Sequence, residues 1–330
     1  MRSPLARFLT AVAATLVLTG CTMTDPGSGA TSAPPTPTPS ASAEPTTESS
    51  VTDDAEAEPI TPETAFAGDC AQVLTDEDLG AIAPATWTLT DLHGADPASD
   101  LAGALSCRWD GAGAGAVSVD ILPLSLVSDE ALATPDIVAC PETEGPELCM
   151  AELAVGDSWL IAGAGSEDAL SAVVGRVGAR LIGQHPVAAP LPAGSWAVPD
   201  CSVIVDAARD GGMPDAEPGV QNDSQPYGPL WDVLVADGRA GWCAAHQPEE
   251  DGIAVTFYPG GADRGRQPSG EDFEVEGADR GWITVDDAGL ITGVLDAGVN
   301  RLTFAGYGYI DMQEDLLGSI LSALAERTDL

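Results

Sequence analysis

The residues of this chain that are most able to do chemistry are its seven cysteines. Cysteine can bind a metal, carry out redox chemistry or form structural disulfides, and the spacing between cysteines separates these uses. Zinc and redox sites use closely spaced pairs such as Cys-x-x-Cys, and the sequence contains none. The histidines His93, His185 and His246 lie far apart, so they complete no ligand set. We therefore expect structural disulfides rather than a metal centre, and we expect no cofactor.

The first cysteine, Cys21, ends a sequence that is typical of an exported protein. A basic start is followed by an apolar run over residues 8–18, which is shorter than the roughly 20 residues needed to span a bilayer. Residues 18–21 read Leu-Thr-Gly-Cys and resemble the lipobox of bacterial lipoproteins, whose cysteine receives palmitate-type acyl chains. The resemblance predicts a signal peptide over residues 1–20 and a lipid anchor on Cys21. The anchor would hold the chain on the outer, extracytoplasmic face of the cell membrane.

The other six cysteines divide between two halves of the chain that repeat one plan. Each half opens with Asp-Cys, at residues 69–70 and 200–201, and continues with a short helical pattern. A second cysteine and an alternating strand that ends in proline follow in both halves. Six cysteines allow 15 pairings in principle. The repeat favours three of the possible disulfides, Cys70–Cys107, Cys201–Cys243 and Cys140–Cys149.

Two further landmarks complete the repeat. Each half has a later strand that contains a tryptophan, Trp159 or Trp282, and each ends in an amphipathic helix. The first half shows no clear counterpart of the segments 290–295 and 299–304. Strands of period two, with helices to cover one face, predict an α+β fold. We expect two tandem related domains, each an antiparallel sheet with covering helices.

Composition sets the expected domain boundaries. Residues 21–64 are rich in proline, serine, threonine, alanine and acids, and such a segment cannot bury enough apolar surface to fold. They are expected to be a disordered tether. The first domain is then expected over residues 65–187 and the second over residues 200–330. Residues 188–199, which carry several prolines, are expected to be the linker.

The charge of the chain is strongly acidic. Lys and Arg together number 12 against 52 Asp and Glu, all the basic residues are arginine, and the formal net charge is −40. Nucleic acids and anionic lipid surfaces are bound chiefly through lysine and arginine, so neither is an expected partner. The acidity fits solubility outside the cell, or attraction for cations or a basic partner.

No arrangement of side chains in the sequence predicts an enzyme. Gly-x-Ser-x-Gly is absent, Ser166 fits a helix cap, and His246 is the best available base without an evident nucleophile. The pair Asp286-Asp287 fits a hairpin turn better than a glycosidase site. We therefore expect a protein without catalytic residues.

Two segments are open to a binding role. The acidic segment 206–223 offers oxygen ligands that suit calcium, but it lacks an Asp-x-Asp-x-Asp-Gly loop, so a solvated loop and a calcium site both stay possible. Tyr227, Trp231 and Trp242 are a candidate binding surface. Tyrosine and tryptophan are enriched in binding sites and are also common in cores, so core packing is the alternative for these three residues.

The first half also resembles a known family. The opening Asp69-Cys70, the segment Leu74-Thr75 with Leu79, and Cys107-Arg108-Trp109 before an alternating strand resemble the cysteine-containing domains of actinobacterial secreted lipoproteins. The resemblance covers residues 68–123. The second half departs from the pattern, since Cys243 is followed by Ala-Ala. These are domains of unknown function, so the resemblance implies disulfides and export but no activity.

These inferences favour a membrane-anchored extracytoplasmic lipoprotein that acts as a non-enzymatic binding or interaction module. Its expected partners are the membrane, through Cys21, and a wall component, a small ligand or a protein. One alternative is a solute-capturing lipoprotein of a transporter, although the halves lack the βαβ pattern of periplasmic-type binding proteins. A cell-wall hydrolase is a further alternative, without a recognisable nucleophile, base or metal set.

Overall fold

The computed structural model describes residues 61–92, 96–133, 137–140, 148–219, 226, 228–247, 252–265, 270–306 and 310–327. The signal sequence, Cys21 and most of the expected tether lie outside these ranges. Two antiparallel sheets, of six and seven strands, are the framework of the described chain. The prediction of an α+β fold with two tandem sheet domains is therefore confirmed. Within the described ranges, we find no helix with the length and apolar character that crossing a membrane requires.

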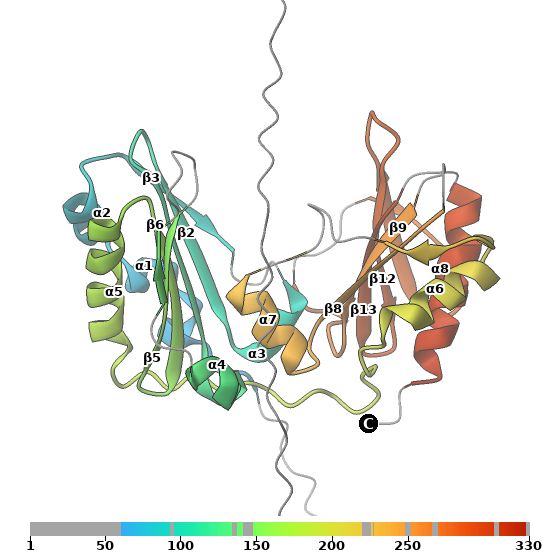
Figure 1. Ribbon diagram of the computed structural model, residues 1–330, viewed down its shortest axis with the longest axis horizontal. Coiled ribbons are helices and arrows are strands. Elements are labelled where there is room, and N and C mark those ends of the chain that lie inside the picture. Colours follow the sequence, from blue (N-terminus) through green and yellow to red (C-terminus); the bar gives the residue numbers. More distant parts are fainter. Residues whose placement is uncertain are drawn as a thin grey trace, which may run out of the picture. The chain divides into compact units, whose positions relative to one another are not determined.

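The first sheet has the strand order β1-β2-β3-β6-β5-β4. Its strands are β1 (Trp87–Asp91), β2 (Leu105–Gly111), β3 (Gly115–Pro123), β4 (Ile137–Ala139), β5 (Cys149–Val155) and β6 (Ser158–Ala164). Its helices are α1 (Cys70–Val73), α2 (Asp76–Ile82), α3 (Pro97–Ala102), α4 (Asp129–Ala133) and α5 (Glu167–Leu181). Short 3-10 turns lie at Ala65–Gly68 and Leu124–Leu126. Helices α1, α2 and α5 lie on one face of this sheet (Figure 1).

Local sequence explains where these helices begin. Thr75 and Asp78 form a capping box at the start of α2, and the Ser166 hydroxyl accepts a hydrogen bond from the Ala169 N–H at the start of α5. Apolar side chains recur along α5 at helical spacing, and the structure buries them against the sheet. They are Leu170, Val173, Val177 and Leu181.

The second sheet has the order β10-β11-β12-β13-β9-β8-β7. Its strands are β7 (Glu217–Pro218), β8 (Gly241–His246), β9 (Gly252–Tyr258), β10 (Glu271–Asp272), β11 (Arg280–Val285), β12 (Ile291–Ala297) and β13 (Asn300–Gly306). Its helices are α6 (Cys201–Asp210), α7 (Pro229–Ala236) and α8 (Ile310–Ala325). Helices α6 and α8 lie side by side on one face (Figure 1).

The two sheets share one topology. Strands β1 to β6 correspond, in chain order and in pairing, to β7, β8, β9, β11, β12 and β13, and β10 is an added edge strand. Trp159 lies on β6 and Trp282 on β11, which are not equivalent strands, so matching these two residues was wrong. The segments 290–295 and 299–304 do have counterparts, in β5 and β6. Their likeness is hidden because every residue of β6 is buried, whereas alternate residues of β13 reach solvent.

A further hydrophobic cluster is shared by the two halves. It joins Leu122 and Trp159 of the first half to Trp231 and Tyr258 of the second. The buried Arg239 also donates from Nη1 to the Leu101 carbonyl oxygen at 3.2 Å. The halves are therefore held together by apolar burial as well as by hydrogen bonds.

The segment expected to be a linker packs against the folded chain. The Ala189 N–H donates to the Leu101 carbonyl at 3.0 Å, and both Ala189 and Trp196 are buried. Order also begins before residue 65, because Glu63 and Val187 exchange backbone hydrogen bonds. Glu63, which was expected to lie in the tether, thus pairs with the folded chain.

Candidate functional site

The three predicted disulfides are confirmed. Their Cα–Cα distances are 5.7 Å for Cys70–Cys107, 4.1 Å for Cys140–Cys149 and 5.3 Å for Cys201–Cys243. The first and third join the opening helix of each half, α1 or α6, to the strand β2 or β8. They fix the helix-covered face of each sheet and leave the opposite face as the place to look for a site.

The three residues of the predicted aromatic surface have three different outcomes. Tyr227 lies outside the described residues. Trp231 is only 8% exposed and belongs to the core shared by the halves, so its assignment to a binding surface was wrong. Trp231 is buried because α7 is an apolar helix that packs Trp231, Val233 and Leu234 into the core together. Trp242 is half-buried on β8, on the face of the second sheet that α6 and α8 do not cover, and it packs against the edge of the shared core.

The face of the second sheet opposite α6 and α8, which we call the open face, is covered by the shared core at Tyr258 and carries its other side chains in rows. Side chains alternate along a strand, and directly paired residues lie beside one another across strands. Trp242 pairs with Thr256, Thr256 with Thr303, Thr303 with Val294, and Val294 with Trp282. The two tryptophans therefore stand at the two ends of a single row, with two threonines and a valine between them. All five side chains are half-buried.

A second row beside it is built from small side chains. It consists of Ala244, Ala254, Ala305, Thr292 and Thr284, on the same five strands. The hydroxyls of Thr284 and Thr292 lie 3.1 Å apart and form a hydrogen bond. Because alanine and threonine are short, this row forms a low floor along the tryptophan row.

The row on the other side begins at Tyr258 of the shared core and continues with charged side chains, and all of it except Arg280 is buried. Asp296 accepts two hydrogen bonds from Arg301, at 2.7 and 3.0 Å, and one from Arg280 at 3.0 Å. Arg280 also donates to Asp263, and this hydrogen bond is the main cause that raises the pKa of Arg280. The charges of Arg280 and Arg301 are balanced by Asp296 in this row and by Asp263, which lies in the segment after β9.

Arg280 also positions Trp282. Its guanidinium carbon lies 5.7 Å from the centre of the Trp282 ring, which is the geometry of a cation–π contact. Since Asp263 and Asp296 fix the guanidinium, the contact restrains the indole while it stays half-exposed. The second sheet thus holds one end of the tryptophan row in a defined orientation.

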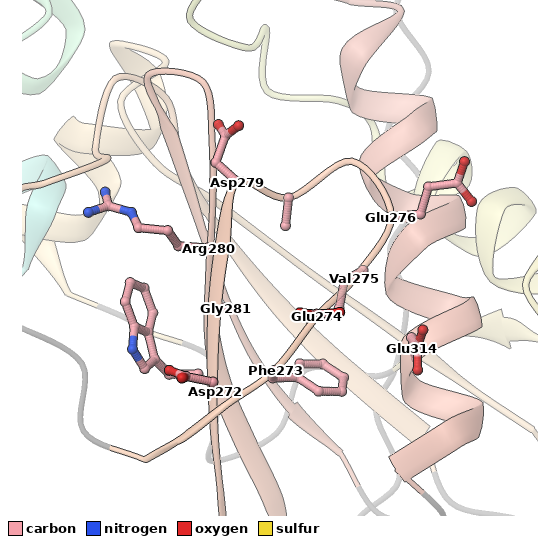
Figure 2. Close-up of a pocket in the computed structure, with 11 residues that line it drawn as sticks. Asp272, Phe273, Glu274, Val275, Glu276, Asp279, Arg280, Gly281 and Glu314 are labelled. Atoms are coloured by element: carbon pink, nitrogen blue, oxygen red, sulfur yellow. The ribbon is translucent and has the colours of Figure 1, made fainter.

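A hollow of about 700 Å³ lies beside Trp282 at the β10–β11 edge (Figure 2). Five carboxylates line it, and Figure 2 shows Glu314 on α8 and Glu276 close to that helix. The five are Asp272, Glu274, Glu276, Asp279 and Glu314. Among the residues that the structure describes, no three His, Cys, Asp or Glu side chains are grouped closely enough to hold a metal ion. The carboxylates of this hollow are spread out rather than convergent.

The acidic segment 206–223 is only partly described. Asp206 forms an ion pair with Arg209 at 2.6 Å, and Asp210 lines a second acidic hollow of about 820 Å³ between α6 and α8. Asn222 and Asp223 lie outside the described residues. In the described part of the segment, Asp206 pairs with Arg209 and Glu217 lies in strand β7. We see no calcium-binding loop in this described part.

Two of the residues weighed for catalysis, Ser166 and Asp286, have structural roles. Ser166 caps α5, and Asp286 accepts hydrogen bonds from the Ala288 and Leu290 N–H groups at 2.8 and 2.9 Å. This turn joins β11 to β12, as the sequence predicted. His246 is half-buried at the end of β8. The structure assigns Ser166 to a helix cap and Asp286 to a turn.

A smaller hollow, of about 280 Å³, lies between the halves. Trp159, Glu152 and Leu126 line it from the first half, and Asp232 and Val233 line it from α7. Burial, and next the Asp232 carboxylate, raise the pKa of Glu152. The Asp232 carboxylate therefore lies close enough to Glu152 to disfavour its ionised form.

The chain matches no protein-family model, no curated protein and no solved structure. Its function therefore has to be argued from its own geometry. Trp282 is the candidate binding residue that the sequence alone did not reveal. It was compared only with Trp159, and the sheet face that it shares with Trp242 was not recognised. Alternation in 280–285 placed it on a polar face, but only the strand register shows that it shares a row with Trp242.

Proposed function

We propose that this chain is an extracytoplasmic lipoprotein, anchored to the cell membrane through Cys21, whose folded part is a non-enzymatic binding module. The proposed binding surface is the open face of the second sheet. The observation that carries the proposal is the row that runs from Trp242 to Trp282 across five strands.

Trp242 packs against the shared core, so the half-exposed tryptophan that needs an explanation is Trp282. Tryptophan is normally well buried, and each ring can add a large apolar contact when a ligand covers it. Trp282 belongs to none of the hydrophobic clusters found in the described residues, and a buried ion-pair row holds it in place. Rigid aromatic side chains with restrained geometry are the usual anchors of recognition surfaces.

The shared core supports a binding module more than a solute-capturing protein. Capture by closure requires two halves that move against each other. In this chain Leu122 and Trp159 are buried together with Trp231 and Tyr258, and Arg239 bridges the same junction. Opening the halves would expose these side chains to water, at a cost of roughly 25 cal/mol for each Å² of apolar surface.

The anchor is tested by Cys21→Ser in the producing bacterium. We expect the variant to appear in the medium, because without the thiol no acyl chain can be attached. Thr22→Ser, one residue further on, is the matched control and should stay in the membrane fraction. Retention of the Cys21→Ser chain in membranes would contradict the lipid anchor.

The binding surface is tested with the released full chain, which carries Cys21→Ser. It is mixed with isolated cell walls of the producing bacterium, and the bound fraction is measured by sedimentation. We expect binding that falls at least tenfold in affinity when Trp242→Ala and Trp282→Ala are combined. Walls that bind both forms equally, or neither form, would sink the proposed surface.

A further inference from the structure

The open face has the chemistry and length for one class of ligand. We infer, building on the proposed function, that its occupant is an extended, uncharged oligosaccharide that lies across the strands from Trp242 to Trp282.

The length of the row excludes a single small ring as the complete ligand. Trp242 and Trp282 are separated by four strand spacings, which at about 4.8 Å each place their Cα atoms roughly 19 Å apart along the sheet. A ligand that covers both rings must be a chain of several units. A sugar or a peptide in extended form has such a length.

The chemistry of the row favours sugars. A sugar ring presents an apolar C–H face and a rim of hydroxyls, and an indole ring can stack on the former. Thr256 and Thr303 between the tryptophans carry hydroxyls, which both donate and accept hydrogen bonds. The row continues to the exposed carboxylate Asp272, which pairs with Trp282 and can accept from a sugar hydroxyl.

The floor beside the row allows a flat ligand to approach the sheet. Ala244, Ala254 and Ala305 project only a methyl group each. A ring stacked on Trp242 can therefore extend over this floor without meeting a long side chain. A peptide strand would gain less here, because its backbone pairs with an exposed sheet edge and not with a face.

Charge complementarity selects an uncharged ligand. On the open face Arg280 and Arg301 are neutralised by Asp296 and Asp263, and they pair through hydrogen bonds at 3.0 Å or less. The surrounding chain has a formal net charge of −40 and repels polyanions. A cation would find its carboxylates in the hollow beyond Trp282 and not between the two tryptophans. The uncharged middle of the row therefore fits an uncharged ligand.

The test uses the released full chain with Cys21→Ser and neutral oligosaccharides of one to six units. The panel contains oligomers of N-acetylglucosamine, glucose, galactose, mannose and arabinose, titrated by calorimetry and by tryptophan fluorescence. At least one series should bind, with affinity that rises at least tenfold from two units to the longest oligomer. Trp282→Ala should lower the affinity of the long oligomer at least tenfold, and Trp282→Tyr should restore part of it.

The matched control is Val285→Ala, on the same strand but with an exposed side chain that is on the opposite side from Trp282. It should bind like the parent chain, and thermal unfolding should show that both variants are folded. Absence of binding in every series would overturn the inference, as would affinity that does not depend on length or on Trp282.

The wall experiment separates this inference from the proposed function. If walls bind through Trp242 and Trp282 but no neutral oligosaccharide does, the binding surface stands and the sugar assignment fails. Binding to walls that survives glycan digestion but is lost after protease treatment would identify a protein partner and overturn the inference. If neither walls nor oligosaccharides bind, both proposals fail.

Discussion

Cys107 and Cys243 occupy the same place in the two sheets. Each pairs across a β-hairpin with a valine, Val119 or Val255, and each is linked by a disulfide to the first residue of a helix, α1 or α6. Together with the matching strand order, this equivalence supports an internal duplication. The same face of both sheets contributes to the shared core, with Leu122, Trp159 and Ile161 from the first copy and Tyr258 from the second. The row that continues to Trp282 is then a specialisation of the second copy.

The disulfides should differ in their contribution to stability. Replacing Cys201 and Cys243 together by serine opens a loop with a sequence separation of 42, whereas Cys140–Cys149 spans 9. In the chain-entropy model the expected losses in the free energy of unfolding are about 4 and about 2.5 kcal/mol. Urea unfolding of the two double variants measures both. Equal losses would show that strain or residual structure, and not loop length, dominates.

The shared core predicts that the two halves unfold together. Trp231→Ala removes a buried side chain at the junction and should cost about 3–5 kcal/mol. Val235→Ala, on the same helix but 40% exposed, is the control and should change stability by less than about 0.5 kcal/mol. Denaturation followed by tryptophan fluorescence and by far-UV circular dichroism should give one coincident transition for the parent chain. Two separate transitions would show that the halves are independent.

Asp78 should make stability depend on pH in the acid range. Burial alone raises its pKa, but hydrogen bonds from Thr75 and Arg180 outweigh this and lower the pKa to about 2. Since the pKa in the folded chain lies below the ordinary 3.8, the carboxylate stabilises the fold above about pH 4. This contribution is lost as the pH falls from about 4 to about 2.

Asp78→Asn checks this sign. The variant loses part of a capping box and the contacts with Arg176 and Arg180, so it should be about 1–2 kcal/mol less stable at pH 7. The difference from the parent chain should narrow as the pH falls to 2, where about half of the Asp78 carboxyl groups in the folded chain are protonated. Asp76→Asn, in the same turn but exposed, is the control. A difference that stays constant between pH 7 and pH 2 would argue against a lowered pKa.

Two glycine substitutions should change stability in opposite directions. A Cβ on Gly293 would meet the Phe304 ring at 2.4 Å and the Trp282 carbonyl oxygen at 2.6 Å, so Gly293→Ala should cost about 1–3 kcal/mol. Gly175 is exposed in the middle of α5, and a Cβ there meets no atom within 4 Å. Gly175→Ala should therefore stabilise the chain by about 0.5–1 kcal/mol. Thermal unfolding of the two variants measures both, and a destabilised Gly175→Ala would contradict the open space seen around that position.

The sequence alone determined those features that depend on neighbouring residues. Thr75 and Ser166 cap helices because a hydroxyl at that position reaches backbone donors of the next turn. Asp286 makes a turn, 117–123 and 253–258 form strands, and α5 buries one stripe, because each pattern depends on the period of a single element. The disulfides could also be predicted, since the repeat restricted the possible pairs.

The tertiary structure decided which elements face one another. Trp159 and Trp282 looked equivalent in the sequence because each lies in a predicted strand before the closing helix of its half. The strand order shows that they lie on β6 and β11, which are not equivalent strands. Trp231 looked like a surface residue until α7 was placed against the first half. The row from Trp242 to Trp282 depends on four separate registers, and a one-residue slip in any of them would move a side chain to the other face. Such pairings join residues far apart in the chain, and only the packing of the complete fold specifies them.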